Sequence, residues 1–314
     1  MTKRLDLACL GESMMQFVPE HGTSETAPSF SAHVAGAESN VAIGLAGLGA
    51  SVAWVSRVGG DAFGRRLRTY IAGHGVDVAN VLDDATQPTG VFFKQPAGEA
   101  RDVAYYRSGS AASAMDRTDA LRAIALAPRI LHLTGITAAL SATCDQATTV
   151  AMAQNLKPET LLSFDVNYRP SLWRNRDLAS HRLKELATQA DIVFVGLDEA
   201  AELWSVESAQ EVHALLGVPT LVVKDAPRRV TGFSVRTRVD LNLPRVKVLE
   251  SVGAGDAYAA GFLYGVLLGW PLLRRMRAGH VLAASALGTL ADQGHKITAG
   301  ELEKMTDEAA WAEL

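Results

Sequence analysis

The chain has 314 residues, a formal net charge of −4 and 48% hydrophobic residues, a composition typical of a soluble globular protein with a large core. No apolar run reaches the roughly 18 residues of a membrane span, and no signal-peptide pattern opens the sequence, so we expect a cytoplasmic protein without a membrane partner. Charges of both signs are interspersed, and the one compact basic cluster, Arg274, Arg275 and Arg277, is typical of a solvated helix face; nucleic acid is not an expected partner. Cys9 and Cys144 are expected in the core, without a disulfide.

Short apolar runs alternate with helical patterns along most of the chain. The predicted buried strands are Leu5–Leu10, Val52–Val55, Ile130–Leu133, Leu161–Phe164, Ile192–Val195 and Thr220–Val223. The predicted helices between them include Ala142–Asn155, Ser180–Ala187 and Ser208–Leu216. This alternation predicts an α/β fold with a doubly wound, mostly parallel sheet and helices on both of its faces.

Two stretches, Met14–Val18 and Thr89–Arg107, interrupt this alternation because strand formers follow one another there without a helix between them. They predict a small antiparallel sheet outside the main layer, built from about residues 12–35 and 89–109. Such a sheet would act as a lid over a ligand crevice at the carboxyl edge of the core, and its edges could pair with a second copy to give a homodimer. With no linker or repeat, residues 1–314 are expected to form one α/β domain.

The run Gly253-Ala254-Gly255-Asp256 opens an apolar helical stretch. Its glycines permit a tight turn, and the N–H groups at a helix start, aided by the helix dipole, can bind an anion. Asp256 is then a candidate general base for a hydroxyl that attacks a γ-phosphate, while the N–H groups of Gly253, Ala254 and Gly255 stabilise the developing charge. Taken by itself, the run is equally compatible with an ordinary helix start that has an acidic first turn.

Several other motif interpretations fail. The glycines of Gly44–Gly49 have the wrong order for a dinucleotide fingerprint and lie inside a helical pattern. No P-loop lysine motif and no Gly-x-Ser-x-Gly motif is present, and the eight histidines have no metal-ligand spacing. His132, on a predicted core strand, is expected to be a buried histidine with its hydrogen bonds satisfied and not a ligand.

Two separated motifs occur in order: Ala35–Asn40, followed by the helical run Val41–Leu48, and Gly253–Asp256. On these residues the chain resembles the ribokinase-like (phosphofructokinase-B) carbohydrate kinases over nearly its whole length. The segments Tyr105–Ala111, His132–Thr137 and Asp165–Trp173 are most similar to the kinases of 2-keto-3-deoxygluconate. The resemblance implies a ribokinase-like fold and an enzyme that uses ATP and Mg²⁺ to phosphorylate the terminal hydroxyl of this sugar acid.

The resemblance also implies a set of substrate-binding residues, namely Gly36, Asn40, Tyr105, Arg107, Arg169 and Asp256. The guanidinium forks of Arg107 and Arg169 suit a carboxylate better than a neutral hydroxyl. The alternative is that each arginine pairs with a nearby acid, as Arg169 could with Asp165. Gln16 stands where relatives acting on neutral sugars often have Asp, which removes a negative charge from near the sugar.

On the nucleotide side the resemblance implies contacts from Lys224, Gly253, Gly255 and Ser285, and a role for Glu199 in organising Mg²⁺ through water. Gly196 stands where the family usually has Asn or Ser. The Gly-rich turn that usually follows Lys224 is replaced by residues 225–232, in which Pro227 lacks an N–H and Arg228 or Arg229 could supply positive charge. The helix Val281–Leu290 would form a wall of the adenine slot, although its small residues equally fit close helix packing.

Two alternatives stay open. One is a kinase of the same family for another sugar, such as fructose or a related keto-acid, because a few hydrogen bonds decide which hydroxyl configuration is accepted. The other is a non-catalytic protein that binds a sugar acid, which the altered turn after Lys224 would favour. A monovalent cation requirement is likewise open.

Overall fold

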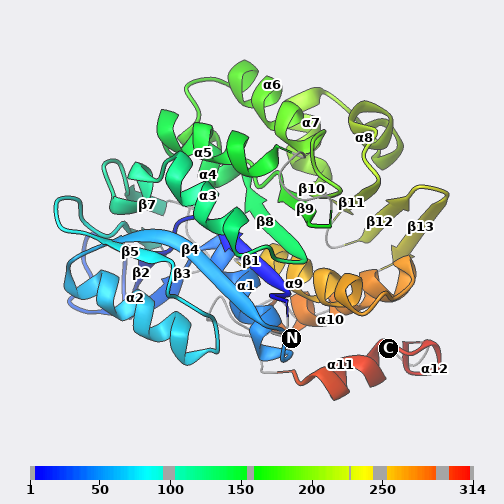
Figure 1. Cartoon of the computed structure of the whole chain (residues 1–314), viewed down its shortest axis with the longest axis horizontal. Coiled ribbons are helices and arrows are strands. Elements are labelled where there is room, and N and C mark those ends of the chain that lie inside the picture. Colours follow the sequence, from blue (N-terminus) through cyan, green and yellow to red (C-terminus); the bar gives the residue numbers. More distant parts are fainter. Residues whose placement is uncertain are drawn as a thin grey trace.

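Figure 1 shows the computed structural model of the chain, which describes residues 4–94, 103–153, 159–225, 228–242, 253–287 and 297–311. Within these residues, a nine-stranded sheet has helices packed on both faces, and a separate four-stranded sheet lies at one side of the molecule near helix α2 (Ala62–Gly73). None of the described helices is long and apolar enough to cross a membrane.

The large sheet has the order β13-β12-β11-β10-β9-β8-β1-β4-β5. Its strands are β1 (Leu7–Leu10), β4 (Val52–Gly59), β5 (Val81–Asp84), β8 (Ile130–Thr134), β9 (Leu161–Asp165), β10 (Ile192–Gly196), β11 (Thr220–Asp225), β12 (Arg229–Ser234) and β13 (Thr237–Asn242). All pairs from β5 to β11 are parallel, and β12 and β13 add an antiparallel edge. Every strand predicted for the main layer is present, and the doubly wound, mostly parallel architecture is confirmed.

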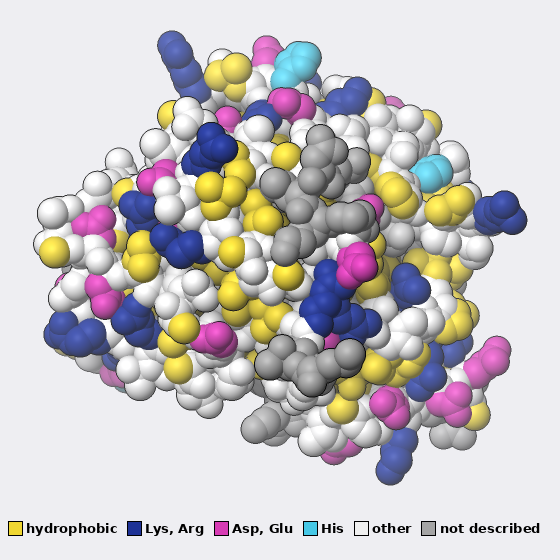
Figure 2. Space-filling model, viewed as in Figure 1, with side chains coloured by type: hydrophobic (Ala, Val, Ile, Leu, Met, Phe, Trp, Pro, Cys, Tyr) yellow, Lys and Arg dark blue, Asp and Glu magenta, His cyan; other side chains and the backbone are white. Residues whose placement is uncertain are grey.

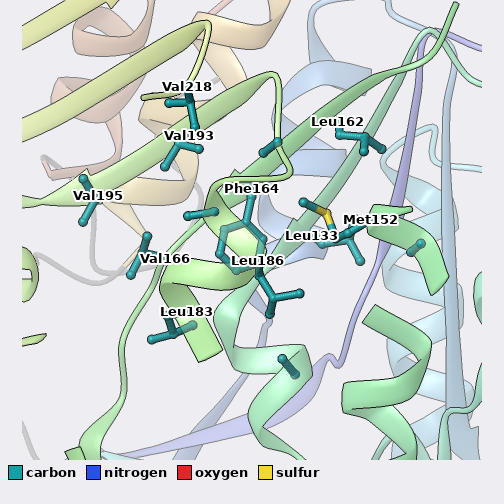
Figure 3. Close-up of a cluster of buried hydrophobic side chains, with 14 of the residues drawn as sticks. Leu133, Met152, Leu162, Phe164, Val166, Leu183, Leu186, Val193, Val195 and Val218 are labelled. Atoms are coloured by element: carbon teal, nitrogen blue, oxygen red, sulfur yellow. The ribbon is translucent and has the colours of Figure 1, made fainter. Parts of the chain in front are cut away.

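Two separate hydrophobic cores cover the two faces of this sheet, because successive strand residues point to opposite sides. One core packs against α1 (Ala37–Gly47), α2, α9 (Ala254–Leu267) and α10 (Leu272–Leu287). The other packs against α3 (Arg117–Ala125), α4 (Gly135–Ala139), α5 (Ala142–Met152), α6 (Arg176–Ala187), α7 (Leu197–Trp204) and α8 (Ala209–Leu216). Figure 3 shows part of this second core, to which β8 and β9 contribute Leu133, Leu162 and Phe164 and α6 contributes Leu183 and Leu186. Cys9 and Cys144 are free and buried, one in each core, as predicted.

Side-chain caps set where several helices begin. Ser208 accepts a hydrogen bond from the N–H of Glu211, so α8 begins where the sequence predicts. Asn175 caps α6 in the same way, and this helix therefore begins before the predicted Ser180. Helix α5 ends at Met152, and the last two residues of its predicted span, 154 and 155, lie outside the described residues.

The small sheet has the order β3-β2-β6-β7, with β2 at Met14–Pro19, β3 at Phe30–Ala35, β6 at Val91–Lys94 and β7 at Val103–Tyr106. Its outer pairs are antiparallel, as predicted, whereas the central pair of β2 and β6 is parallel. Strand β2 follows β1 and β6 follows β5, and both of these end at the same edge of the large sheet. Both small-sheet strands therefore leave that edge side by side and in the same direction.

The basic cluster predicted on a solvated helix face instead holds the C-terminal segment. Arg277 is only 9% exposed and donates to the carbonyl of Thr306, while its guanidinium lies 5.4 Å from the ring of Trp311. Arg274 stacks 4.0 Å from the ring of Trp270 and donates to the Glu303 carbonyl. The prediction was wrong because α11 (Ala299–Met305) and α12 (Glu308–Trp311) fold back onto α10, which the local charge pattern does not show.

On the face in Figure 2, basic and acidic side chains are spread with hydrophobic ones between them.

Candidate active site

The start of α9 has the backbone conformation that the Gly253–Asp256 run predicts. Gly253 is the N-cap residue, with φ +80° and ψ −12°, a left-handed conformation that strongly favours glycine. Asp256 lies in the first turn of the helix, where the first peptide N–H groups have no partner within the helix. This end of α9 is therefore suited to bind an anion, while residues 250–252, which immediately precede the run, lie outside the described residues.

The two motifs, 216 residues apart, meet in one hydrogen bond: Asn40 Nδ2 donates to Asp256 Oδ2 at 2.9 Å. One turn further along each helix, Gly44 of α1 lies against Ala260 of α9, and a Cβ on Gly44 would be 2.7 Å from the Ala260 Cβ. Gly44 thus permits the close approach of α1 and α9 that brings Asn40 to Asp256. The amide oxygen of Asn40 is buried and has no hydrogen-bond partner among the described residues.

Charged side chains surround Lys224, at the end of β11. Its ammonium contacts the Asp165 carboxylate at 3.2 Å. Burial by itself lowers the pKa of Lys224, but the attraction of Asp165, Glu199 and Asp256 outweighs burial and leaves the pKa above its ordinary value. Burial, followed by repulsion from Asp165, raises the pKa of Glu199. Arg169 lies 4.0 Å from Glu199, so its acidic neighbour is Glu199 and the predicted alternative partner, Asp165, pairs with Lys224.

Arg107 lies in a different ion pair. Its Nε donates to Glu12 Oε2 at 2.7 Å, a second guanidinium nitrogen contacts the same oxygen, and Ser110 donates to Glu12 Oε1 at 2.6 Å. The Arg107 guanidinium also lies 5.6 Å from the ring of Tyr105, whereas Tyr106 contacts Phe93. The two tyrosines thus have different neighbours, as strand alternation predicts.

Like Glu12, Glu38 is a buried acid; it lies in the first turn of α1. Thr134 and Thr137 both donate to its Oε1, at 2.8 and 2.6 Å, while its Oε2 has no hydrogen-bond partner among the described residues. Burial raises the pKa of Glu38, although the two threonine hydrogen bonds oppose this shift. Gly11 makes room for the carboxyl, because a Cβ there would lie 2.1 Å from the Glu38 carboxyl carbon.

Sequence reasoning missed Glu12, Glu38 and Asp165 as members of the site. A signal for each was present: Glu12 follows the glycine at the end of β1, Glu38 lies inside the Ala35–Asn40 motif, and Asp165 ends a parallel strand. Ligands of doubly wound folds bind outside such carboxyl ends. Their partners become apparent only in the tertiary structure: Glu12 pairs with Arg107, Glu38 accepts from Thr134, and Asp165 pairs with Lys224.

The remaining predicted residues lie around these groups. Gly36 precedes α1 and packs on the β1–β2 connection, where its Cβ would be 2.6 Å from the Glu12 carbonyl oxygen, so the close approach is to the protein's own backbone. Ser285 lies on α10, which ends at Leu287, and residues 288–290 of the predicted helix lie outside the described residues. His132 is buried, as predicted, and bonded through Nδ1 to Ser163 at 2.9 Å, but its Nε2 has no hydrogen-bond partner among the described residues, so only one of its two ring nitrogens is satisfied. Burial lowers its pKa to about 4.

Lys224 lies near the end of β11, which pairs antiparallel with β12. Strands β11 and β12 pair from Thr220–Ser234 to Asp225–Arg229, and residues 226–227 lie outside the described residues. Gly232 does not serve the turn after Lys224: it lies within β12, where a Cβ would be 2.5 Å from the sulfur of Met276 in α10. The first glycine after Lys224 is therefore a packing residue.

The sequence model of the pfkB family carbohydrate kinases matches residues 4–296. The chain belongs to this family. It is 34% identical over 296 residues to 2-dehydro-3-deoxygluconokinase of Bacillus subtilis, covering 90% of this chain and 89% of that one. It is 32% identical over 298 residues to the enzyme of the same name in Thermoproteus tenax, covering 92% and 90%. A sugar kinase of Pyrococcus horikoshii, solved in complex with ATP, superposes with a TM-score of 0.82 at 25% identity, over 98% of this chain and all of that one (100%).

This pfkB-family member is a carbohydrate kinase, as the resemblance implied. Its ribokinase-like fold is likewise confirmed by the match with solved relatives. Because both motifs that carry the resemblance meet at Asn40 and Asp256, the start of α9 is our candidate for the centre where phosphoryl transfer occurs.

Proposed function

We propose that this kinase transfers the γ-phosphate of ATP to the terminal hydroxyl of 2-keto-3-deoxygluconate, which is the same compound as 2-dehydro-3-deoxygluconate. The observation that carries the proposal is the hydrogen bond from Asn40 to Asp256, which holds a carboxylate at an anion-binding helix start. The relatives named for this sugar acid support the substrate.

Asp256 is the general base in this proposal. Its carboxylate accepts the proton of the sugar hydroxyl as that oxygen forms a bond to the γ-phosphorus, and the bond from phosphorus to the bridging oxygen of ADP breaks. The N–H groups of Gly253, Ala254 and Gly255 stabilise the charge that develops on the phosphoryl oxygens. Asp256 is also close enough to Lys224 for its negative charge to contribute to the raised pKa of that lysine, so the proposed base lies beside a cation.

The sugar binds over Gly36 and Asn40. The amide oxygen of Asn40 is buried and has no hydrogen-bond partner among the described residues, so it is available as an acceptor for a sugar hydroxyl; leaving a buried acceptor unpaired is unfavourable. Tyr105 packs on the sugar, and Arg107 and Arg169 receive its acid end. Both arginines already have a protein carboxylate nearby, so the sugar acid adds to existing ion pairs instead of meeting two unpaired cations.

ATP binds along the other side of Asp256, with Lys224, Gly253 and Gly255 near its phosphates and Ser285 near its base. In this proposal Mg²⁺ would be held mainly by phosphate oxygens and water, which are ligands that this ion prefers. Glu199 is the carboxylate available for a water-mediated contact. When bound, the ion would neutralise phosphate charge.

The small sheet covers the sugar and also forms a homodimer in this proposal. One of its faces carries an aromatic cluster in which Phe17 stacks on Phe93 at 5.3 Å, Phe30 meets Phe93 edge-on at 5.5 Å, and Tyr106 is 65% exposed. A second copy is the occupant we propose for this face, in line with the exposed edges of the sheet. Light scattering tests this: a monomer at micromolar concentration would contradict it.

The decisive experiment measures ADP release with ATP and Mg²⁺ against 2-keto-3-deoxygluconate, its galactose-derived epimer, gluconate, fructose and ribose. We expect turnover of the keto-deoxy acids, and an Asp256→Asn variant with turnover lowered by about 10²–10⁴-fold but unchanged sugar binding by calorimetry. Preference for a neutral sugar would overturn the substrate. An active Asp256→Asn variant would overturn the base, and wild-type protein that binds the acid without turnover would favour a non-catalytic role.

A further inference from the structure

We infer that Glu12 is a positioning residue for the acceptor sugar: its buried carboxylate fixes the guanidinium of Arg107 in the orientation that receives the sugar. This inference rests on the proposed function, in which Arg107 binds the acceptor. No motif assigned a role to Glu12, and it does not itself contact the reacting atoms in our proposal.

The carboxylate of Glu12 is fully engaged. Oε2 receives Arg107 Nε at 2.7 Å together with a second nitrogen of the same guanidinium, and Oε1 receives the Ser110 hydroxyl at 2.6 Å. Glu12 is 2% exposed and Arg107 is 8% exposed. Because water is excluded, these charge-assisted hydrogen bonds define the orientation of the arginine more strictly than a surface ion pair would.

The contact joins two parts of the fold. Glu12 lies between β1 of the large sheet and β2 of the small sheet, and Arg107 directly follows β7, at the far edge of the small sheet. Gly90 provides the space for the carboxylate, since a Cβ on Gly90 would lie 2.8 Å from Glu12 Oε1. The carboxylate of Glu12, in the connection after β1, is thus enclosed by the chain before β6 and by the residues that follow β7.

The geometry leaves part of Arg107 uncommitted to Glu12. A guanidinium has five N–H donors in a fixed plane, and Glu12 engages the edge formed by Nε and one terminal nitrogen. Because the guanidinium is planar and rigid, fixing this edge also fixes the direction of the opposite edge. The Tyr105 ring packs beside the guanidinium, with its centroid 5.6 Å away. Losing this orientation weakens sugar binding in the ground state and the transition state alike, which raises KM and leaves kcat largely unchanged.

The test is a double-mutant cycle with Glu12→Gln and Arg107→Met, using whichever panel sugar the wild-type enzyme phosphorylates with the lowest KM. Glutamine keeps the shape of the side chain and removes its charge. We expect Glu12→Gln to raise the sugar KM about tenfold or more, with kcat and the KM for ATP changed less than about twofold. In the Arg107→Met background, Glu12→Gln should change the sugar KM by less than about twofold, since Glu12 acts through Arg107.

Asp119→Asn is the matched control. Asp119 is also fully buried and pairs with an arginine, Arg57, at 2.7 Å, but it lies in the first turn of α3 and belongs to no part of the proposed site. It should lower the melting temperature without changing the sugar KM. If Glu12→Gln does not fold, Ser110→Ala replaces it in the cycle, because it removes a hydrogen bond to the same carboxylate. We then expect Ser110→Ala to raise the sugar KM, and we expect no such rise in the Arg107→Met background.

Two results would overturn the inference: an unchanged sugar KM in Glu12→Gln, or an equal rise in KM with and without Arg107. Failure of the proposed function would be detected in a different measurement, the sugar panel with the wild-type enzyme, as a preference for a neutral sugar. The cycle remains informative then, because it is run with the sugar that the enzyme accepts.

Discussion

Gly44→Ala is the substitution that most directly tests how the site is assembled. The added methyl group would lie 2.7 Å from the Ala260 Cβ, which is fully buried in α9. Since carbon atoms pack at about 3.5–4.0 Å, α1 and α9 must separate locally by about 1 Å. Asn40 and Asp256 lie one helical turn away on the same two helices, and their hydrogen bond is 2.9 Å long.

Two terms set the expected stability change. Overpacking a core costs about 1–3 kcal/mol, and replacing a helical glycine by alanine gains about 1 kcal/mol, so the free energy of unfolding should fall by about 0–2 kcal/mol. Activity is more sensitive: a displacement of about 1 Å can cost roughly 100-fold in rate. We therefore expect kcat/KM to fall by one to two orders of magnitude while the protein stays folded.

Urea unfolding and steady-state kinetics on the same samples measure both effects. Gly47→Ala is the matched control, because Gly47 lies in the same helix, is exposed, and has no atom within 4 Å of an added Cβ. It should raise stability by about 0.5–1 kcal/mol and leave kinetics unchanged. Ala260→Gly removes the opposing methyl group and should restore activity to Gly44→Ala. Full activity in Gly44→Ala, or no rescue by Ala260→Gly, would refute the helix-approach argument.

Three further predictions concern the pH dependence of stability and the C-terminal segment. The lowered pKa of His132, about 4 in the folded protein, means that below pH 6.5 the unfolded chain binds a proton that the folded one does not; stability should fall by roughly 3 kcal/mol at most between pH 6.5 and pH 4, and urea titrations of His132→Gln should show a smaller fall. The raised pKa of Glu38 has the opposite effect on stability: as pH rises above the pKa of Glu38 in the unfolded chain, the unfolded chain loses a proton that the folded protein keeps, so wild-type stability falls. Glu38→Gln should therefore be more stable relative to wild type at pH 8 than at pH 4. The same stability difference at both pH values would contradict this. Trp311→Ala removes the ring that contacts Arg277 and His280 and should cost about 1–3 kcal/mol in thermal unfolding; an unchanged melting temperature would show that the C-terminal helices contribute no stability.

Much of the fold could be predicted because its signals are local. Buried runs such as Ile192–Val195 and Thr220–Val223 indicate strands of a parallel sheet, since a helical pattern of adequate length precedes each of them. The small sheet was also predicted from strand formers without intervening helices. The parallel pairing of β2 with β6 was not, because it depends on both strands leaving the same edge of the large sheet.

The candidate site was predicted only in part. The Gly253–Asp256 run indicated a helix start with an acid in its first turn, and the backbone has that form. Arg107 and Arg169 could be named as candidates, but their ion pairs with Glu12 and Glu199 join residues 95 and 30 positions apart along the chain. Such pairs leave no periodicity in a single sequence. The basic residues of α10 were misjudged for the same reason, since Trp311 covers Arg277 only after the chain turns back.

The sequence by itself determined six of the nine strands of the large sheet, their alternation with helices and the helix start at Gly253, because hydrophobic periodicity and glycine's freedom act within a few residues. The outer strands β5, β12 and β13 were not predicted. Only the tertiary structure decided which charges neutralise one another and which helices touch. Asn40 meets Asp256 because Gly44 lets α1 approach α9, and Lys224 meets Asp165 because β9, β10 and β11 lie side by side. Electrostatic and packing energies depend on distances in space, which the order of residues along the chain does not contain.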